Sequence, residues 1–226
     1  MNDKLYIVST PIGNYQDITL RALEVLRSVN FIICEEFKEA RRLLSQYQID
    51  KELVTLNEHN ENESVDEILP RLTKGESAAL ISDCGTPLFS DPGHLLLDLC
   101  LSHKIQVVPV PGASSLLTAI MASGLHLEKF YYYGWLSPKK EERQKELAKL
   151  RHLKEAIIFL DTPYRLKSLL SDAAKIFSKT TPAVLAYELT SSNEKFYRGS
   201  IDEVLKTAES KNLKGEFVLV VDNRGR

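Results

Sequence analysis

The chain has 226 residues, of which 43% are hydrophobic, and a formal net charge of −2 at pH 7. This composition excludes an intrinsically disordered chain and supplies enough apolar side chains for one large domain or two small ones. No apolar run approaches the roughly 20 residues of a membrane-spanning helix, and the first residues lack the pattern of a secretory signal. Three cysteines without a CxxC pair are typical of a reducing compartment, so we expect a cytoplasmic protein.

The first half of the chain alternates short apolar strands with amphipathic helices. The strands are expected at residues 5–9, 31–34, 53–56, 78–82 and 105–109, with helices between them. Asp17 is the expected N-cap of the first helix, because apolar residues at helical spacing follow it. Strands that read as continuous apolar runs, each followed by a helix, indicate a mostly parallel sheet covered on both faces.

The second half repeats this alternation after Pro111 and Gly112. Strands are expected at residues 130–133, 156–160, 183–188 and 217–221, and residues 195–199 are expected to form the return arm of a hairpin. We therefore predict two α/β domains with mostly parallel or mixed sheets, residues 1–112 and 113–226.

Three loops rich in Gly and Pro directly follow predicted strands: residues 9–14, 82–93 and 109–115. Ligands of open parallel sheets bind beyond the carboxyl ends of the strands, and glycine lets a backbone approach a ligand closely. The loops are therefore candidate walls of one pocket, although Pro and Gly also simply mark turns. The sequence has no phosphate-binding P-loop, no full dinucleotide fingerprint, no hydrolase elbow and no zinc-ligand spacing, so we expect no metal.

Motifs along nearly the whole chain resemble one known family. They are Leu5–Asn14, Asp17–Ala22, Asn57–Glu61, Ser82–Pro87, Ser90–Gly93, Val108–Ser115, Pro138–Lys140, Pro163–Leu166, Glu188–Thr190, Arg198–Gly199 and Lys214–Val218. In this order they resemble the small-subunit ribosomal RNA methyltransferase I family, within the tetrapyrrole (corrin/porphyrin) methylase superfamily.

The resemblance implies a tetrapyrrole methylase-like α/β fold with S-adenosylmethionine in a cleft between two lobes, and a homodimer. It further implies methyl transfer to the ribose 2′-oxygen of a cytidine in small-subunit ribosomal RNA. The residues expected to bind the cofactor are Pro11, Gly13, Ser82, Asp83, Gly85, Thr86, Phe89, Ser114, Ser115, Leu160, Tyr164, Tyr187 and Gly215. Among them, Tyr164 and Tyr187 are expected to flank the adenine.

The chain departs from the family pattern at a few positions. After the second strand the family has an acidic pair followed by Thr-Arg, whereas this chain has Glu35-Glu36-Phe37-Lys38. Cys84 replaces an alanine, and Tyr15-Gln16 replaces Leu-Gly. The sequence also resembles a short form without the C-terminal extension of longer members.

Glu35 and Asp83 are the candidate general bases, because both fall at predicted strand ends and a weakly nucleophilic ribose hydroxyl needs a base within hydrogen-bond reach. Their alternative roles are helix capping for Glu35 and loop hydrogen bonding for Asp83. The expected RNA-binding residues are Lys139, Lys140, Arg143 and Arg165, because cationic side chains meet phosphates. Glutamates interleaved with them are equally typical of a solvated helix face.

Two competing interpretations remain at this stage. One is methylation of a tetrapyrrole or another small molecule by the same fold. The other is a cofactor-binding protein without turnover.

Overall fold

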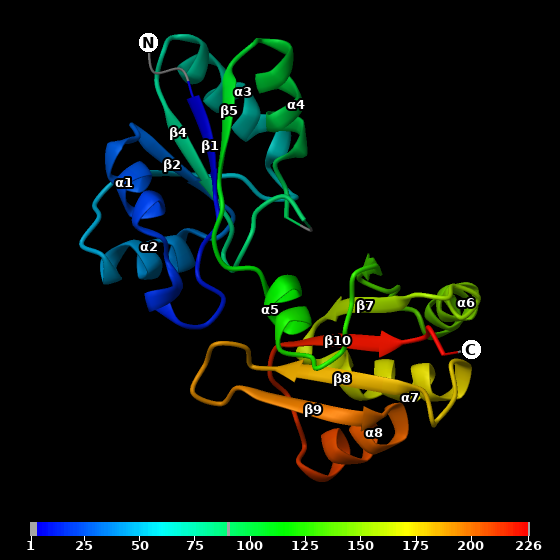
Figure 1. The fold of residues 1–226 in the computed structure, drawn as a ribbon. Coiled ribbons are helices and arrows are strands. Elements are labelled where there is room, and N and C mark those ends of the chain that lie inside the picture. The colour runs from blue at the N-terminus through cyan, green and yellow to red at the C-terminus, as the bar shows by residue number, and fades with distance from the viewer. Residues whose placement is uncertain (1–3, 90, 226) are drawn as a thin grey trace. The chain divides into compact units, whose positions relative to one another are not determined.

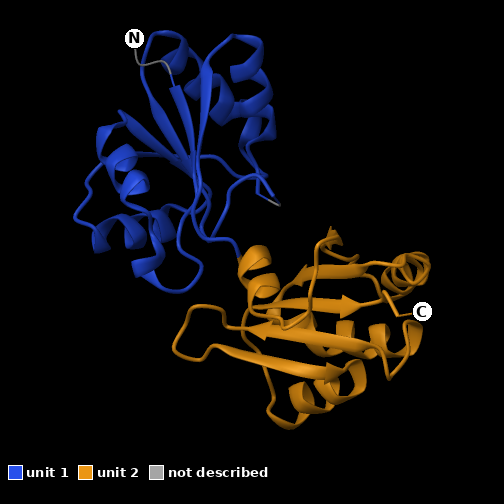
Figure 2. Ribbon diagram, viewed as in Figure 1, with its two compact units in different colours: residues 1–114 blue, residues 115–226 orange. Residues whose placement is uncertain are grey.

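The computed structural model describes residues 4–89 and 91–225. The chain divides into two compact units, Met1–Ser114 (unit 1) and Ser115–Arg226 (unit 2), each with its own sheet (Figure 2). The boundary follows Ser114 rather than residue 112. The prediction of an α/β fold with two mostly parallel or mixed sheets is confirmed. No helix in the described part of the chain is long and apolar enough to cross a membrane.

Unit 1 is built on five parallel strands in the order β3-β2-β4-β1-β5 (Figure 1). The strands are β1 (Lys4–Val8), β2 (Phe31–Cys34), β3 (Glu52–Thr55), β4 (Ala78–Ile81) and β5 (Gln106–Val110). The helices are the short 3₁₀ helix η1 (Tyr15–Asp17) and α1 (Leu20–Ser28), α2 (Phe37–Gln46), α3 (Glu61–Thr73) and α4 (His94–Ser102). Val8 pairs with both Ile81 and Val110, so the carboxyl ends of β1, β4 and β5 lie level with one another.

The unit 1 sheet is covered on both faces, and its inner strands β2 and β4 are apolar and buried at every position. On one face, Ile32 and Ala79 pack with buried residues of α1 and α2. On the other, Ile33 and Leu80 pack with buried residues of α3 and α4. This two-sided burial leaves the loops at the strand ends as the part of the sheet open to a ligand.

The first helix of unit 1 begins later than predicted. Thr19, not Asp17, is its N-cap, and the Thr19 hydroxyl accepts a hydrogen bond from the Ala22 N–H at 3.1 Å. Asp17 instead ends η1, which Asn14 caps by accepting from the Gln16 N–H. Both residue types are good caps. The difference arises because Ile18 is extended and interrupts the helical backbone.

Unit 2 carries a mixed sheet in the order β6-β7-β10-β8-β9 (Figure 1). Its strands are β6 (Phe130–Gly134), β7 (Ala156–Asp161), β8 (Pro182–Tyr187), β9 (Lys195–Ser200) and β10 (Phe217–Asp222). Its helices are α5 (Ser115–Met121), α6 (Lys140–Leu150), the 3₁₀ helix η2 (Pro163–Arg165), α7 (Leu166–Ile176) and α8 (Ile201–Ser210). Strand β10 is antiparallel to both β7 and β8, and the predicted hairpin of β8 and β9 is confirmed.

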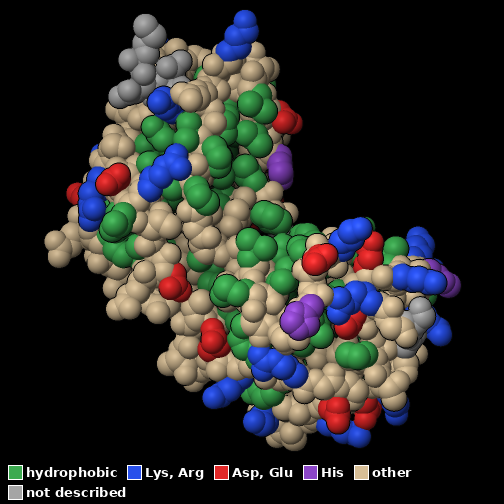
Figure 3. Space-filling model, viewed as in Figure 1, with side chains coloured by type: hydrophobic (Ala, Val, Ile, Leu, Met, Phe, Trp, Pro, Cys, Tyr) green, Lys and Arg blue, Asp and Glu red, His purple; other side chains and the backbone are tan. Residues whose placement is uncertain are grey.

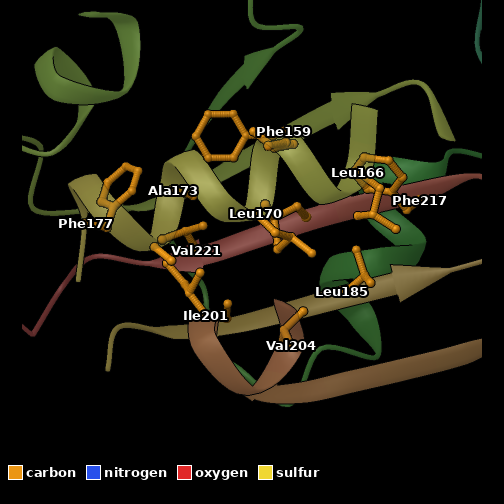
Figure 4. Close-up of a cluster of buried hydrophobic side chains, with 14 of the residues drawn as sticks. Phe159, Leu166, Leu170, Ala173, Phe177, Leu185, Ile201, Val204, Phe217 and Val221 are labelled. Carbon is orange, nitrogen blue, oxygen red and sulfur yellow. The ribbon is translucent and has the colours of Figure 1, made fainter. Parts of the chain in front are cut away.

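The core of unit 2 lies between the sheet and helices α6, α7 and α8. Phe159, Leu185 and Phe217 point from the sheet toward Leu170 and Val204 on the helices (Figure 4). Because side chains alternate along a strand, Leu160 and its paired neighbours Val218 and Ala186 face the opposite side of the sheet. Leu160 therefore lies on the face of the unit 2 sheet that helices α6, α7 and α8 do not cover.

Candidate functional site

The carboxyl edge of the unit 1 sheet gathers the three loops singled out in the sequence. They follow β1, β4 and β5, and hydrogen bonds join all three. The Ser9 N–H, just after β1, donates to the Val110 carbonyl at 3.1 Å. The Thr86 hydroxyl, in the loop after β4, lies 3.3 Å from the Ser9 hydroxyl and donates to the Ala113 carbonyl at 3.1 Å. The three loops thus form one connected surface within unit 1.

Thr10 connects the first two loops. Its side chain is buried, and its hydroxyl lies 3.1 Å from the Ser82 carbonyl oxygen and 3.4 Å from that of Gly85. The same hydroxyl accepts from the Gly85 N–H at 3.1 Å, while the Thr10 N–H donates to the Gly85 carbonyl at 2.8 Å. Thr10 is not among the cofactor-binding or catalytic residues expected from the sequence. Its position as a hydroxyl residue directly after the first strand is the only local signal for this role.

Two glycines in these loops have no room for a side chain. A Cβ on Gly112 would lie 3.0 Å from the Ser9 Cβ. Gly85 has a φ of +85°, and a Cβ there would lie 3.1 Å from the Ile12 side chain. Close backbone packing and a left-handed conformation both favour glycine. The predicted cofactor residue Gly85 is therefore explained by loop packing, whether or not a ligand contacts it.

Carboxyl groups gather at the same edge of unit 1. Burial raises the pKa of Glu35, and the nearby charges of Asp83, Asp91 and others raise it further. Burial also raises the pKa of Asp83, and Glu36, Glu39 and Asp91 add to the rise, although a hydrogen bond from the Glu36 N–H (3.3 Å) opposes it. Burial likewise raises the pKa of Asp91, against hydrogen bonds from Ser82 and Leu88. These carboxyls give the edge a concentrated negative charge.

The remaining unit 1 residues of the predicted cofactor set occupy varied environments. Pro11 and Ser82 are buried, Ser114 and Ser115 are half-buried, and Gly13 and Phe89 are exposed. The Ser82 hydroxyl accepts from the Cys84 N–H and so shapes the loop after β4. Ser115 is the first residue of α5. Ser90 lies outside the described residues.

The predicted cofactor residues of unit 2 separate onto the two faces of its sheet. Leu160 faces away from the helices, with Val218 and Ala186. The Tyr187 ring packs on the opposite face with the core, edge-on to Tyr197 at 6.2 Å between ring centroids. Tyr187 and Leu160 thus do not present their side chains to the same space.

Gly215 lies in a tightly held turn before β10. A Cβ there would lie only 2.1 Å from the Glu188 Oε1 and 2.6 Å from the Tyr187 hydroxyl. The Glu188 carboxylate accepts from the Glu216 N–H at 2.7 Å, and the Tyr187 hydroxyl accepts from the Lys214 N–H at 3.3 Å. The packing of the turn itself therefore favours glycine at position 215.

A pocket of about 490 Å³ opens beside this turn, and its walls are Pro163, Tyr164, Lys167, Leu213 and Lys214. Tyr164 is 84% exposed. Lys167 belongs to α7, which covers the helix face of the sheet, so Tyr164 faces a different space from Leu160. Pockets for small ligands typically have volumes of about 300–1,000 Å³.

Two of the four predicted RNA-binding residues point into unit 2. Arg143 is buried, and its Nη2 forms an ion pair with the Asp172 Oδ2 at 2.7 Å. Arg165 donates from Nη2 to the Ser137 carbonyl at 2.9 Å, and its Nε lies 3.2 Å from the Asp161 Oδ1. Carbonyls and buried carboxylates therefore already bind both guanidinium groups within unit 2, which disfavours them as surface contacts for phosphates. Their role in RNA binding stays a prediction.

Lys139 and Lys140 are exposed at the start of α6, as an RNA contact requires. Lys139 Nζ forms a surface ion pair with Glu142 at 3.5 Å. Lysine and arginine side chains are spread over the visible face of unit 2, with acidic side chains among them (Figure 3). No group of three or more His, Cys, Asp or Glu residues within 4–89 and 91–225 has the arrangement of a metal site.

The sequence is similar to curated bacterial proteins along nearly its whole length. It is 42% identical over 218 residues to the ribosomal RNA small subunit methyltransferase I of Bacillus subtilis, covering 96% of this chain and 74% of that protein. It is 38% identical to the protein of the same name from Thermotoga maritima, covering 98% of this chain and 99% of that protein. The Escherichia coli O157:H7 protein of this name is 39% identical, with coverages of 97% and 77%.

Solved structures of two methyltransferases share the fold. Cobalt precorrin-4 methyltransferase superposes with a TM-score of 0.70 at 18% identity, covering 97% of this chain and 95% of the other. Uroporphyrin-III-C-methyltransferase from Thermus thermophilus superposes with a TM-score of 0.68 at 20% identity, with coverages of 99% and 96%. Residues 4–205 match the family described as tetrapyrrole (corrin/porphyrin) methylases. The chain therefore belongs to the tetrapyrrole (corrin/porphyrin) methylase family of methyltransferases.

Proposed function

We propose that this protein transfers a methyl group from S-adenosylmethionine to the ribose 2′-oxygen of a cytidine in small-subunit ribosomal RNA. The observation that supports it most is the 37–42% identity to relatives named ribosomal RNA small subunit methyltransferase I, which extends over 96–98% of the chain. The proposed substrate places the enzyme in the cytoplasm. The resemblance to the family also supports a homodimer.

The unit 1 edge suits the proposed cofactor in charge and in the polar groups that it offers. S-adenosylmethionine carries a sulfonium and an ammonium against a single carboxylate, so its net charge is positive. The carboxyls of Glu35, Asp83 and Asp91 provide a negative environment for it. The Ser82, Thr86 and Ser114 hydroxyls, with the backbone at Pro11, Gly13 and Gly85, supply polar groups for the methionine and ribose parts. Phe89 and Ser115 flank the same loops, and Leu160, Tyr187 and Gly215 remain the candidates in unit 2.

The bound cofactor would supply a methyl group that is already activated for transfer. The chain's own residues then have to hold the ribose oxygen in line with that methyl, and such positioning is worth about 7–11 kcal/mol in well-oriented reactions. Glu35 and Asp83 are the proposed bases for the ribose proton. Their raised pKa values make them stronger bases than ordinary carboxylates, because burial and neighbouring charges disfavour their ionised forms.

Labelled S-adenosylmethionine tests this proposal when incubated with three acceptors: small ribosomal subunits, free ribosomal RNA and tetrapyrroles. Label on the ribose of subunit RNA is the expected result. Label on a tetrapyrrole alone would replace the proposal with small-molecule methylation. Binding of S-adenosylhomocysteine without transfer to any acceptor would replace it with a cofactor-binding role.

Single amide substitutions identify the base. Glu35→Gln or Asp83→Asn should lower kcat about 10²–10⁴-fold while calorimetry shows unchanged S-adenosylhomocysteine affinity. Glu67→Gln is the matched control, because Glu67 is an exposed carboxylate on α3 that does not contribute to the pKa shift of either candidate base. Unchanged kcat in either variant would remove that residue as the base.

A further inference from the structure

The pocket beside α7 in unit 2 combines an aromatic side chain with two lysines. Its walls are Pro163 and Tyr164 after β7, Lys167 on α7, and Leu213 and Lys214 before β10. None of these five residues is acidic. In the described part of the chain, no ion pair joins Lys167 or Lys214 to a carboxylate.

The walls of this pocket are held in place by the protein itself. The Lys167 Nζ donates to the Asn212 Oδ1 at 2.7 Å, which links α7 to the turn before β10. The Lys214 N–H donates to the Tyr187 hydroxyl, and a Cβ at position 215 would displace the Glu188 carboxylate and the Tyr187 hydroxyl. An ammonium group has three donors, so Lys167 keeps donors for a ligand. These hydrogen bonds hold the pocket in a preformed shape.

Tyr164 is the most exposed aromatic side chain at this edge, at 84%. Burial of such a ring normally contributes to stability, so its exposure favours a ligand-stacking role. Unpaired RNA bases stack on tyrosine rings, and lysines contact the adjoining phosphates.

The positive charge of the pocket favours a nucleotide of RNA over the adenosine of S-adenosylmethionine. The adenosine of S-adenosylmethionine belongs to a molecule with net positive charge and no phosphate, which two lysines would repel. A nucleotide of RNA carries a phosphate, which they attract. The acidic residues of the neighbouring turn do not line the pocket, since the Glu188 carboxylate binds the Glu216 N–H.

We propose that this pocket binds an unpaired nucleotide of the RNA substrate, with its base stacked on Tyr164 and its phosphate beside Lys167 and Lys214. This assignment rests on the proposed function and specifies where its substrate is held. It also moves Tyr164 from the expected cofactor set to the RNA set.

Fluorescence anisotropy with a labelled cytidine homopolymer tests the assignment without requiring turnover. Tyr164→Ala should weaken RNA affinity by about tenfold or more, whereas Tyr164→Phe, which keeps the ring, should stay near wild type. Lys167→Ala and Lys214→Ala should each reduce the slope of log affinity against log salt by about 0.7. Lys175→Ala, an exposed lysine on the same helix outside the pocket, is the control.

Calorimetry with S-adenosylhomocysteine on the same variants should show unchanged affinity. Loss of that affinity with RNA binding intact would assign the pocket to the cofactor and overturn the proposal. RNA affinity unchanged in Tyr164→Ala and in both lysine variants would also overturn it. A different result would contradict the proposed function alone. In that case the wild-type protein would bind the homopolymer at this pocket but transfer no methyl group to ribosomal RNA.

Discussion

The two units contrast in the charge they present at the edges of their sheets. In unit 1 the strands are all parallel, and the loops at their carboxyl ends carry Glu35, Asp83 and Asp91 with raised pKa values. In unit 2 the sheet is mixed, and the corresponding edge presents Lys167, Lys214 and the exposed Tyr164, with Glu188 and Glu216 in the neighbouring turn. Its buried acids, Asp161 and Asp172, lie against arginines instead.

This contrast shows that similar α/β units can carry different charged side chains in the loops at their strand ends. The apolar cores of both units need only alternating strands and helices, which place no demand on charge at the strand ends. An acidic edge suits a cationic methyl donor, whereas a basic edge suits a polyanionic acceptor. The charge difference between the units thus parallels the two substrates in the proposed reaction.

The largest expected effect is that of substituting Arg143, the buried arginine of α6 in unit 2. Arg143→Ala should lower the free energy of unfolding by about 3–5 kcal/mol, because it leaves the buried Asp172 carboxylate without its ion pair. Urea unfolding followed by circular dichroism measures this. Lys140→Ala, on the exposed side of the same helix, should change stability little. A stable Arg143→Ala variant with weakened RNA affinity would instead return Arg143 to the RNA surface.

The turn before β10 should be nearly as sensitive. Gly215→Ala places a methyl group against the Glu188 carboxylate and the Tyr187 hydroxyl, so we expect a loss of about 1–3 kcal/mol or more. Thermal unfolding provides the measurement. The control is Gly225→Ala, because nothing lies within 4 Å of a Cβ at that position. Equal melting temperatures for the two variants would contradict the packing of this turn.

Much of the fold was predictable because apolar runs and helical periodicity reflect burial directly. Both sheets, the boundary region near Gly112 and the β8–β9 hairpin follow from such patterns. The pattern did not indicate which face of the sheet each side chain of a strand points to. Leu160 is the penultimate residue of β7 and Tyr187 is the last residue of β8, and only the pairing of both strands with β10 shows that they face opposite sides.

The candidate site was less predictable, since its contacts join residues far apart in sequence. Thr10 meets Gly85 across 75 positions, and Arg143 meets Asp172 across 29. Arg143 did carry one local signal, because it shares helical spacing with the buried Leu147 and Leu150. Its charge concealed that signal, since a buried arginine requires a partner that the local sequence does not reveal.

Within unit 1, Thr10→Val tests whether the Thr10 hydroxyl holds the loops after β1 and β4 together. Removing the hydroxyl leaves the Gly85 N–H without its acceptor, which costs about 1–3 kcal/mol for a buried group. Because the loops after β1 and β4 then lose a shared contact, S-adenosylhomocysteine affinity should fall as well. Calorimetry and urea unfolding measure the two effects. Thr10→Ser, which keeps the hydroxyl, should restore both, and equal behaviour of the two variants would remove Thr10 as the connection.

The smallest expected effect is a pH dependence at the carboxyl edge of unit 1. Burial and neighbouring charges raise the pKa values of Glu35, Asp83 and Asp91 above those of the unfolded chain. The folded state therefore binds more protons than the unfolded state at mildly acidic pH. By linkage, the stability that this proton binding adds is complete at low pH and is lost as pH rises through the raised pKa values.

Native-state hydrogen exchange can follow this loss in each unit separately, between about pH 4 and pH 7. Protection in unit 1 should fall by less than about 1 kcal/mol over this range, because water screens partly exposed carboxyls. Asp83→Asn should flatten the dependence, since an amide does not titrate, while the control Glu67→Gln should leave more of it. Because burial also raises the pKa values of Asp161 and Glu216 in unit 2, the decisive comparison lies within unit 1. An unchanged pH dependence of unit 1 in Asp83→Asn would show that this carboxyl is not its source.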